Sequence, residues 1–158
     1  LNIFLNKNFK NKNNFYFINF TNIIFKEHTI NNFRNRLFNF HPSYLPEFKG
    51  INAFTRAYNT NGKSGFTVHL ISKKIDAGKI ICSKEFELKK DYDIKKVHEL
   101  ANKYFISLTF EAINKLLKNK NFKKQNIKKA KYWRQRKESD GLLDFKNMSD
   151  IESPSPNQ

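Results

Sequence analysis

Cysteine and methionine each occur only once in this 158-residue chain, as Cys82 and Met148, while five residues are glycine and four are proline. A single cysteine cannot form an internal disulfide, which is typical of reducing compartments, so we expect a cytoplasmic location. Cys82 follows two isoleucines in an expected strand, and we expect a buried thiol there. No segment approaches the roughly 20 consecutive apolar residues of a membrane-spanning helix, and no membrane association is expected. The four histidines have no ligand spacing with Cys82, so no metal cofactor is expected either.

Acidic residues are also scarce. The chain has 14 Asp and Glu residues against 30 Lys and Arg residues, which gives a formal net charge of +16. Such an excess favours nucleic-acid binding, and Trp133 beside Tyr132 and Arg134 could stack on bases. Against this, Lys, Asn, Phe and Ile are the residues of A/T-rich codons, and no RNA-binding motif is present. A nucleic acid such as tRNA therefore stays an alternative partner, and a small molecule is the expected one.

Short apolar runs alternate with amphipathic segments along the chain. We expect strands at residues 15–20, 36–41, 66–71 and 79–86, and helices at residues 25–33 and 52–59. The best helix begins after Asp91, the expected N-cap, and its apolar stripe comprises Ile94, Val97, Ala101, Tyr104, Phe105, Leu108, Ala112, Ile113 and Leu116. Strands that alternate with helices predict an α/β fold in which helices flank a mostly parallel sheet.

The residues that carry chemistry gather in two loops. Asn39 and His41 lie two positions apart, so a strand over residues 36–41 presents both side chains on one face, and Pro42 then turns the chain. Asp76 lies in a second loop, residues 73–78, between two apolar runs. An amide donor, a titratable ring and a carboxylate that orients it are the parts of an acyl-transfer site. Taken alone, Asp76-x-Gly78 is an ordinary turn in which the glycine supplies a positive φ.

The order and spacing of these residues resemble a known family. The chain has a pattern similar to that of the folate-dependent formyltransferases. The pattern consists of Asn39-x-His41-Pro42-Ser43-x-Leu45-Pro46, then Gly50, then Gly65-x-Thr67-Val68-His69, then Asp76-x-Gly78-x-Ile80-Ile81. Members of this family formylate glycinamide ribonucleotide, methionyl-tRNA or amino sugars on nucleotides. The resemblance extends from about residue 15 to residue 145. It implies a Rossmann-like formyltransferase domain.

The resemblance also implies roles for individual residues. A formyl group would pass from the cosubstrate 10-formyltetrahydrofolate to a primary amine, with Asn39, His41 and Asp76 as the catalytic residues. The loop that contributes Lys73, Lys74, Ile75, Asp76 and Gly78 would line the folate pocket. His69 lies in a strand with Phe66, Val68 and Leu70, and we expect a packed ring or one that supports the site from behind, rather than a ligand.

The chain begins with Leu1, and we expect a fragment that lacks the first βαβ part of its relatives. Residues 1–14 contain no G-x-G pattern and are unassigned. Residues 15–117 are expected to form a partial catalytic domain with the C-terminal half of the sheet, and residues 118–131 a basic linker. Residues 132–158 form a tail that resembles the segment by which the chain leaves the catalytic domain in the methionyl-tRNA and nucleotide-sugar branches.

Two features separate the branches of the family. The tail argues against membership in the glycinamide ribonucleotide branch. Pro42 and the Thr67-Val68-His69 triplet argue against membership in the methionyl-tRNA branch. We therefore expect an amino-sugar nucleotide, or another small amine, as the acceptor. Methionyl-tRNA and glycinamide ribonucleotide formyltransferases are the alternatives within the family. An inactive remnant or a basic RNA-binding protein is the alternative of another class.

Overall fold

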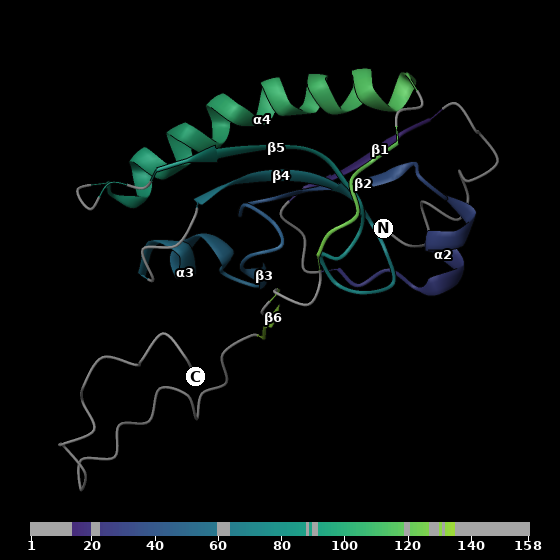
Figure 1. Cartoon of the computed structure of the whole chain (residues 1–158), viewed down its shortest axis with the longest axis horizontal. Helices are drawn as coiled ribbons and strands as arrows, with labels where there is room; N and C mark the ends of the chain where they lie inside the picture. Colours follow the sequence, from purple (N-terminus) through teal and green to yellow (C-terminus); the bar gives the residue numbers. More distant parts are fainter. Residues whose placement is uncertain are drawn as a thin grey trace, which may run out of the picture.

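The computed structural model describes residues 14–19, 23–59, 64–87, 89, 92–118, 121–126, 130 and 132–134. Its centre is a four-stranded sheet in the order β1-β2-β4-β5 (Figure 1). These strands are β1 (Tyr16–Asn19), β2 (Leu37–His41), β4 (Ser64–Leu70) and β5 (Ile80–Phe86). A second, two-stranded sheet joins β3 (Lys49–Gly50) to β6 (Tyr132–Trp133).

Helices cover both faces of the larger sheet. Helix α4 (Ile94–Leu117) lies above β4 and β5 in Figure 1, whereas α3 (Ala53–Asn59) and α2 (Glu27–Asn32) lie below the sheet. The expected α/β fold, with its four strands and three helices, is confirmed. None of the helices in the described ranges is long and apolar enough to cross a membrane.

The sheet is mixed, and the expectation of mostly parallel strands was wrong in this respect. Strands β1 and β2 are parallel, but β2 pairs with β4, and β4 with β5, in antiparallel fashion. The connection from β4 to β5 spans only residues 71–79, which is too short for the crossover that two parallel strands need. This short connection is the loop that carries Asp76.

Alternation along the central strands separates an apolar face from a polar one. Phe38 and Phe40 of β2, with Phe66 and Val68 of β4, point toward α4 and are almost fully buried. The rings of Phe40 and Phe66 stack at 5.1 Å, and Phe105 of α4 packs edge-on against Phe40. Aromatic pairs of this kind add to the stability that comes from buried apolar area. The neighbouring positions on the same strands face the other way.

Helix α4 begins two residues later than the sequence suggested. Its N-cap is Asp93, whose carboxylate accepts a hydrogen bond of 2.7 Å from the backbone N–H of Lys96. Asp91 lies outside the described residues, as do the side chains of Ile94 and Val97. The rest of the expected stripe faces the sheet: Ala101, Leu108, Ala112 and Leu116 are buried, and Tyr104, Phe105 and Ile113 are half-buried.

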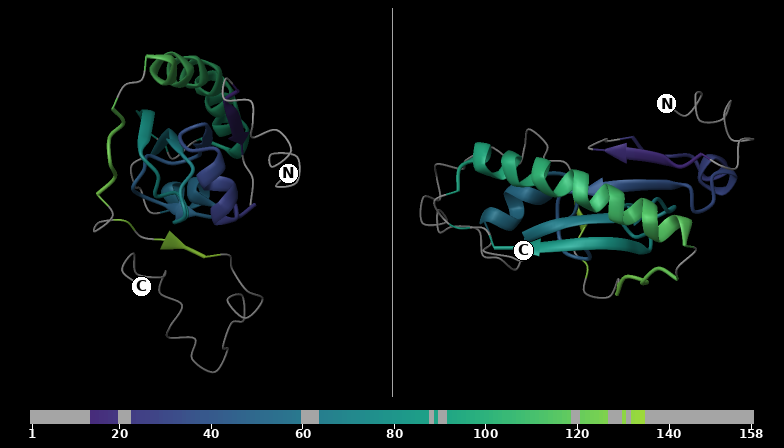
Figure 2. Two further views of the ribbon diagram at one scale, coloured as in Figure 1. Left: turned by 90° about the vertical axis from the view of Figure 1, so that its right-hand side faces the viewer. Right: turned by 90° about the horizontal axis from the view of Figure 1, so that it is seen from above.

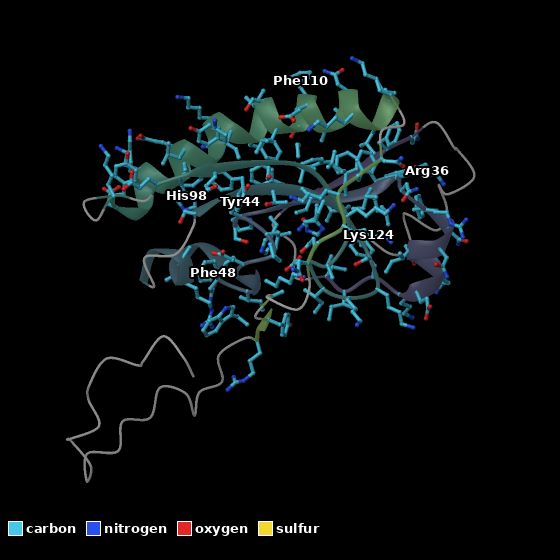
Figure 3. All side chains as sticks on the ribbon, in the orientation of Figure 1. Arg36, Tyr44, Phe48, His98, Phe110 and Lys124 are labelled. Carbon is cyan, nitrogen blue, oxygen red and sulfur yellow. The ribbon has the colours of Figure 1, made fainter. Side chains whose placement is uncertain are left out.

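Two further features of α4 follow from this packing. Cys82 of β5 lies beneath the helix, and its thiol donates to the carbonyl of Leu108, so the expected buried thiol is confirmed. Burial raises the pKa of this thiol to about 12. Figure 3 shows Phe110 on the opposite side of α4, where it projects away from the sheet.

Candidate active site

The polar face of β2 and β4 forms the floor of the site. Asn39 lies directly across from His69, and His41 lies directly across from Thr67. A β-bulge between Val68 and His69 shifts the register of β4 against β5 at this point. Bulges redirect side chains beside functional sites, and this one occurs at the residue whose ring faces Asn39. The expectation that Asn39 and His41 share one face is confirmed by this pairing.

His41 is held by the chain that follows it. Only 3% of the residue is exposed, and its Nε2 lies 3.0 Å from the carbonyl oxygen of Phe48. Because a carbonyl only accepts, Nε2 carries the hydrogen, and Nδ1 lies free of the backbone at 3.6 Å from Asp76 Oδ2. Phe48 holds a positive φ of 53°, a backbone conformation of higher energy that aims its carbonyl at the ring.

Asp76 is the point where the strands and loops converge. Its Oδ2 accepts a hydrogen bond of 2.8 Å from the Gly50 N–H, and its Oδ1 lies 3.5 Å from His69 Nε2. Burial alone would raise the pKa of Asp76. The hydrogen bond from His69, the charge of His41 and the Gly50 N–H outweigh burial and lower this pKa from 3.8 to about 2. The carboxylate is therefore ionised at every physiological pH.

His69 lies behind Asn39 and Asp76. Its Nδ1 donates to the carbonyl of Leu70 at 2.9 Å, so Nε2 faces the site. This nitrogen lies 3.4 Å from Asn39 Nδ2 and 3.5 Å from Asp76 Oδ1. In the neutral ring Nε2 accepts from the Asn39 amide, and in the protonated ring it donates to Asp76. The ring thus contacts two of the three residues expected to be catalytic.

The charge state of His41 differs from that of Asp76. Burial lowers the pKa of His41 below 6.5, and the Asp76 carboxylate offsets only part of this effect. The ring is therefore neutral at pH 7. A neutral imidazole beside a permanent carboxylate can accept a proton, because the imidazolium that forms is paired at once. Lys49 of β3 is also buried here, and within the described part of the chain its Nζ has no hydrogen-bond partner.

The loop that carries Asp76 is held tightly against β4. Leu70 N–H donates to the Lys79 carbonyl at 2.9 Å, and a Cβ atom at Gly78 would lie 1.7 Å from the Leu70 carbonyl oxygen. The glycine is therefore required for close approach and not for a positive φ, which the alternative interpretation of Asp76-x-Gly78 as an ordinary turn would need. Asp76 itself adopts the positive φ, at 46°.

A cavity of about 440 Å³ opens beside these residues. Asn39, His41, His69 and Asp76 line one part of it. Apolar side chains line the rest, among them Ile18, Ile23, Ile24, Ile71 and Ile75. Ile23, Ile24 and Ile75 are 44%, 72% and 40% exposed, so three apolar side chains lie together at the open part of the cavity. This combination suits a largely apolar ligand that brings one reactive polar group to the histidines.

The loop residues expected to contact folate divide into two groups. Lys73, Ile75 and Asp76 line the cavity. The Lys73 ammonium is exposed and lies 2.9 Å from Glu27 of α2. Lys74 is exposed beside the cavity rather than among its lining residues, and Gly78 is buried behind Asp76. Within the described ranges, no group of three or more His, Cys, Asp or Glu side chains could hold a metal ion.

The segment after α4 returns to the site, which the sequence did not reveal. Figure 2 shows residues 121–126 running along the edge of the larger sheet. Lys123 exchanges two backbone hydrogen bonds with Ile80 at the start of β5. Further along, Trp133 O accepts from the Ile51 N–H, and the Arg56 guanidinium lies 4.2 Å from the centre of the Trp133 ring. Tyr132 lines the cavity.

Comparison with known proteins shows which family this chain resembles. The sequence model of a family described as Formyl transferase matches residues 15–113. A methionyl-tRNA formyltransferase of Borrelia garinii subsp. bavariensis is 32% identical over 133 residues, which are 82% of this chain and 41% of that protein. The chain therefore spans about two-fifths of the length of this curated relative.

Two solved structures show the same fold. The formyltransferase PseJ from Anoxybacillus kamchatkensis, in complex with a UDP-linked formamido sugar and tetrahydrofolate, matches with a TM-score of 0.73. It is 22% identical and covers 84% of this chain and 70% of its own. WlaRD, a sugar 3N-formyltransferase crystallised in the presence of dTDP and 5-N-formyl-THF, is 30% identical with a TM-score of 0.65. That match covers 77% of this chain and 44% of WlaRD.

Proposed function

The chain belongs to the formyl transferase family, and from this premise we propose that it transfers a formyl group from 10-formyltetrahydrofolate to a primary amine. The observation that carries the proposal is the meeting of Asn39, His41 and Asp76 at one end of a cavity that is otherwise apolar. His69 supports this group from behind. Each of these side chains is buried or half-buried, so the site is assembled before any ligand enters.

The proposed chemistry assigns one task to each side chain. The amine nitrogen attacks the formyl carbon, and negative charge develops on the formyl oxygen. Asn39 donates a hydrogen bond to that oxygen, which stabilises the transition state more than the ground state. The excess proton of the amine leaves toward neutral His41 or, through water, toward Asp76. The bond from the formyl carbon to N10 then breaks, the proton passes to N10, and tetrahydrofolate is released.

The apolar part of the cavity is proposed to hold the folate. The pteridine of a folate is flat, with a polar edge and two faces that can pack against aliphatic side chains, and Ile18, Ile24, Ile71 and Ile75 offer such a surface. The loop with Lys73, Lys74, Ile75, Asp76 and Gly78 borders this surface. WlaRD, which is 30% identical to this chain, was crystallised in the presence of 5-N-formyl-THF, and this likeness supports a folate as the donor.

For the acceptor we propose an amino sugar on a nucleotide, or a similarly small amine. The likeness to WlaRD, a sugar formyltransferase, supports this choice. Methionyl-tRNA is the second candidate, favoured by the 32% identity to the Borrelia enzyme and by the net charge of +16. Glycinamide ribonucleotide is the remaining candidate within the family.

The test offers 10-formyltetrahydrofolate together with each acceptor in turn: a dTDP- or UDP-amino sugar, methionyl-tRNA, or glycinamide ribonucleotide. Release of tetrahydrofolate and the mass of the formylated product are measured. We expect formylation of the amino sugar, and loss of at least about 100-fold in rate for His41→Ala and for Asp76→Ala. His98→Ala is the matched control, because His98 is an exposed histidine on α4 and does not line the cavity (Figure 3).

Other outcomes would point elsewhere. Product formation with methionyl-tRNA alone would select the second candidate. Binding of tRNA that survives 200 mM salt, without any formylation, would favour a basic RNA-binding protein. No formylation of any acceptor, together with no binding of 5-formyltetrahydrofolate in calorimetry, would leave an inactive remnant and refute the proposed function.

A further inference from the structure

Gln125 lies far from the site in sequence but touches its central loop. Its side-chain Nε2 donates to the carbonyl of Asp76 at 3.0 Å and to the carbonyl of Gly78 at 2.6 Å. An amide nitrogen carries two hydrogens, and both are used on this one loop. The Oε1 of the same side chain is buried and has no hydrogen-bond partner among the described residues. The amide is therefore oriented by the loop alone.

The backbone around Gln125 explains how it reaches the loop. Lys123 is fixed to the first residue of β5 by two backbone hydrogen bonds, Ile80 N–H to Lys123 O at 2.9 Å and Lys123 N–H to Ile80 O at 3.2 Å. This bridge anchors the segment two residues before Gln125. Figure 3 shows Lys124, its exposed neighbour, on the same stretch. Gln125 thus extends from an anchored strand-like segment rather than from a free linker.

The loop needs support on this side. Asp76 adopts a positive φ of 46°, which costs a residue other than glycine about 1 kcal/mol or more unless its surroundings hold it there. On the inner side, Gly78 presses against Leu70. On the outer side, within the described chain, the carbonyls of Asp76 and Gly78 accept from Gln125. Gln125 therefore completes the support of the turn that aims the Asp76 carboxylate.

We propose that Gln125 is a positioning residue, whose amide holds the loop of residues 76–78 so that the Asp76 carboxylate stays between His41 and His69. The role in catalysis rests on the proposed formyl transfer. The positioning itself does not, because it concerns only the distance from the carboxylate to the two rings. Gln125 touches no reacting atom, and its effect passes entirely through Asp76.

The first test measures this distance through titration rather than activity. The groups that face Asp76 are His41 from β2, His69 from β4, the Gly50 N–H and the charge of Lys49 from β3. In a Gln125→Met variant the loop loses both donors, and the carboxylate moves away from the rings. Carbon-13 titration by NMR should then place the pKa of Asp76 above its parent value of about 2, and the pKa of His41 below its parent value, each by roughly one pH unit.

Two controls accompany this titration. Lys124→Met introduces the same residue at the adjacent, exposed position and should change the pKa of neither Asp76 nor His41. The far-UV circular dichroism of each variant should match that of the parent, which shows that the fold is intact. Unchanged titration of both Asp76 and His41 in folded Gln125→Met would overturn the proposal.

The second test uses Gln125→Glu and covers the case in which the methionine variant does not fold. A charged glutamate repels both carbonyls, but a protonated one can donate a single hydrogen bond. The affinity for 5-formyltetrahydrofolate is measured by calorimetry, or the rate of formylation by an activity assay. The ratio of the variant's value to the parent's value should rise as the pH falls from 7 to 5. A misplacement of about 1 Å predicts a rate loss of about 100-fold at pH 7. A ratio that is flat with pH would refute the positioning role, whereas a parent that binds no folate would refute the proposed function instead.

Discussion

Replacement of Asp76 by asparagine should change the stability of the protein in a way that depends on pH. Asparagine keeps an oxygen for the Gly50 N–H at nearly the same place, so the turn can persist while the charge is lost. In the parent, the pKa of Asp76 falls from 3.8 to about 2, although burial acts against this shift, because His69, His41 and the Gly50 N–H stabilise the ionised form. At 1.36 kcal/mol for each pH unit, this difference corresponds to about 2 kcal/mol of folding free energy.

The sign of the effect follows from proton linkage. A carboxyl group whose pKa is lower in the folded state contributes stability above about pH 4, and this contribution is lost as the pH falls toward 2. His41 acts in a second window. Its folded pKa is lowered by burial, so the protein loses stability as the pH falls below 6.5, and it loses more when the Asp76 charge is absent. The free energy of unfolding of the parent should therefore exceed that of the variant by the largest amount near pH 4 to 5.

The assay is urea unfolding followed by circular dichroism at 222 nm, which reports the 24 residues of α4. The free energies of unfolding of parent and Asp76→Asn are compared at half-unit steps from pH 7 to pH 2.5. We expect the difference to grow as the pH falls below 6.5, and then to shrink by about 2 kcal/mol below pH 4. A difference that stays constant across this range would refute the electrostatic account and leave Asp76 with a purely structural role in the turn.

Three more predictions follow from the same contacts. Gly78→Ala would place a Cβ atom 1.7 Å from the Leu70 carbonyl oxygen, and should lower the free energy of unfolding by roughly 2 to 4 kcal/mol in urea titrations. Leu108→Ala should cost about 2 to 5 kcal/mol in the same experiment, because Leu108 is buried on the side of α4 that faces the sheet, whereas Leu117→Ala on the exposed side of α4 should cost less than about 0.5 kcal/mol. Asn39→Ala should reduce kcat for formyl transfer by roughly 100- to 1,000-fold with little change in KM. A rise in KM with kcat unchanged would contradict an oxyanion role.

Local patterns in the sequence predicted much of the fold. Alternation in β4 distinguishes the apolar Phe66, Val68 and Leu70 from the polar Thr67 and His69, and the structure places these two sets on opposite faces, both of them buried. The i, i+2 spacing of Asn39 and His41 likewise predicted their common face. These inferences succeeded because each depends on residues within a single strand, whose geometry fixes side-chain direction.

The direction of the strands and the surroundings of Asp76 could not be predicted in the same way. Strands β2 and β4 are separated along the chain by residues 42–63, and no local pattern encodes their antiparallel pairing. The short connection over residues 71–79, by contrast, already favours antiparallel pairing of β4 with β5. The N–H of Gly50 and the amide of Gln125 reach Asp76 from 26 and 49 residues away. Gln125 lies in a stretch rich in Lys and Asn, whose composition indicates a linker, and only its contacts reveal another role.

The contacts around Asp76 also bear on the proposed transfer of a proton to His41. A buried carboxylate without partners would become protonated, but here the Gly50 N–H donates to it, and the two rings stabilise its charge once they are protonated. His41 is neutral at rest, so a proton that reaches Nδ1 creates a positive charge 3.6 Å from an existing negative one. The transfer therefore neutralises a buried charge instead of isolating a new one, which lowers its cost in a site of low dielectric constant. The residues that fix the position of Asp76 thus determine how readily His41 accepts a proton.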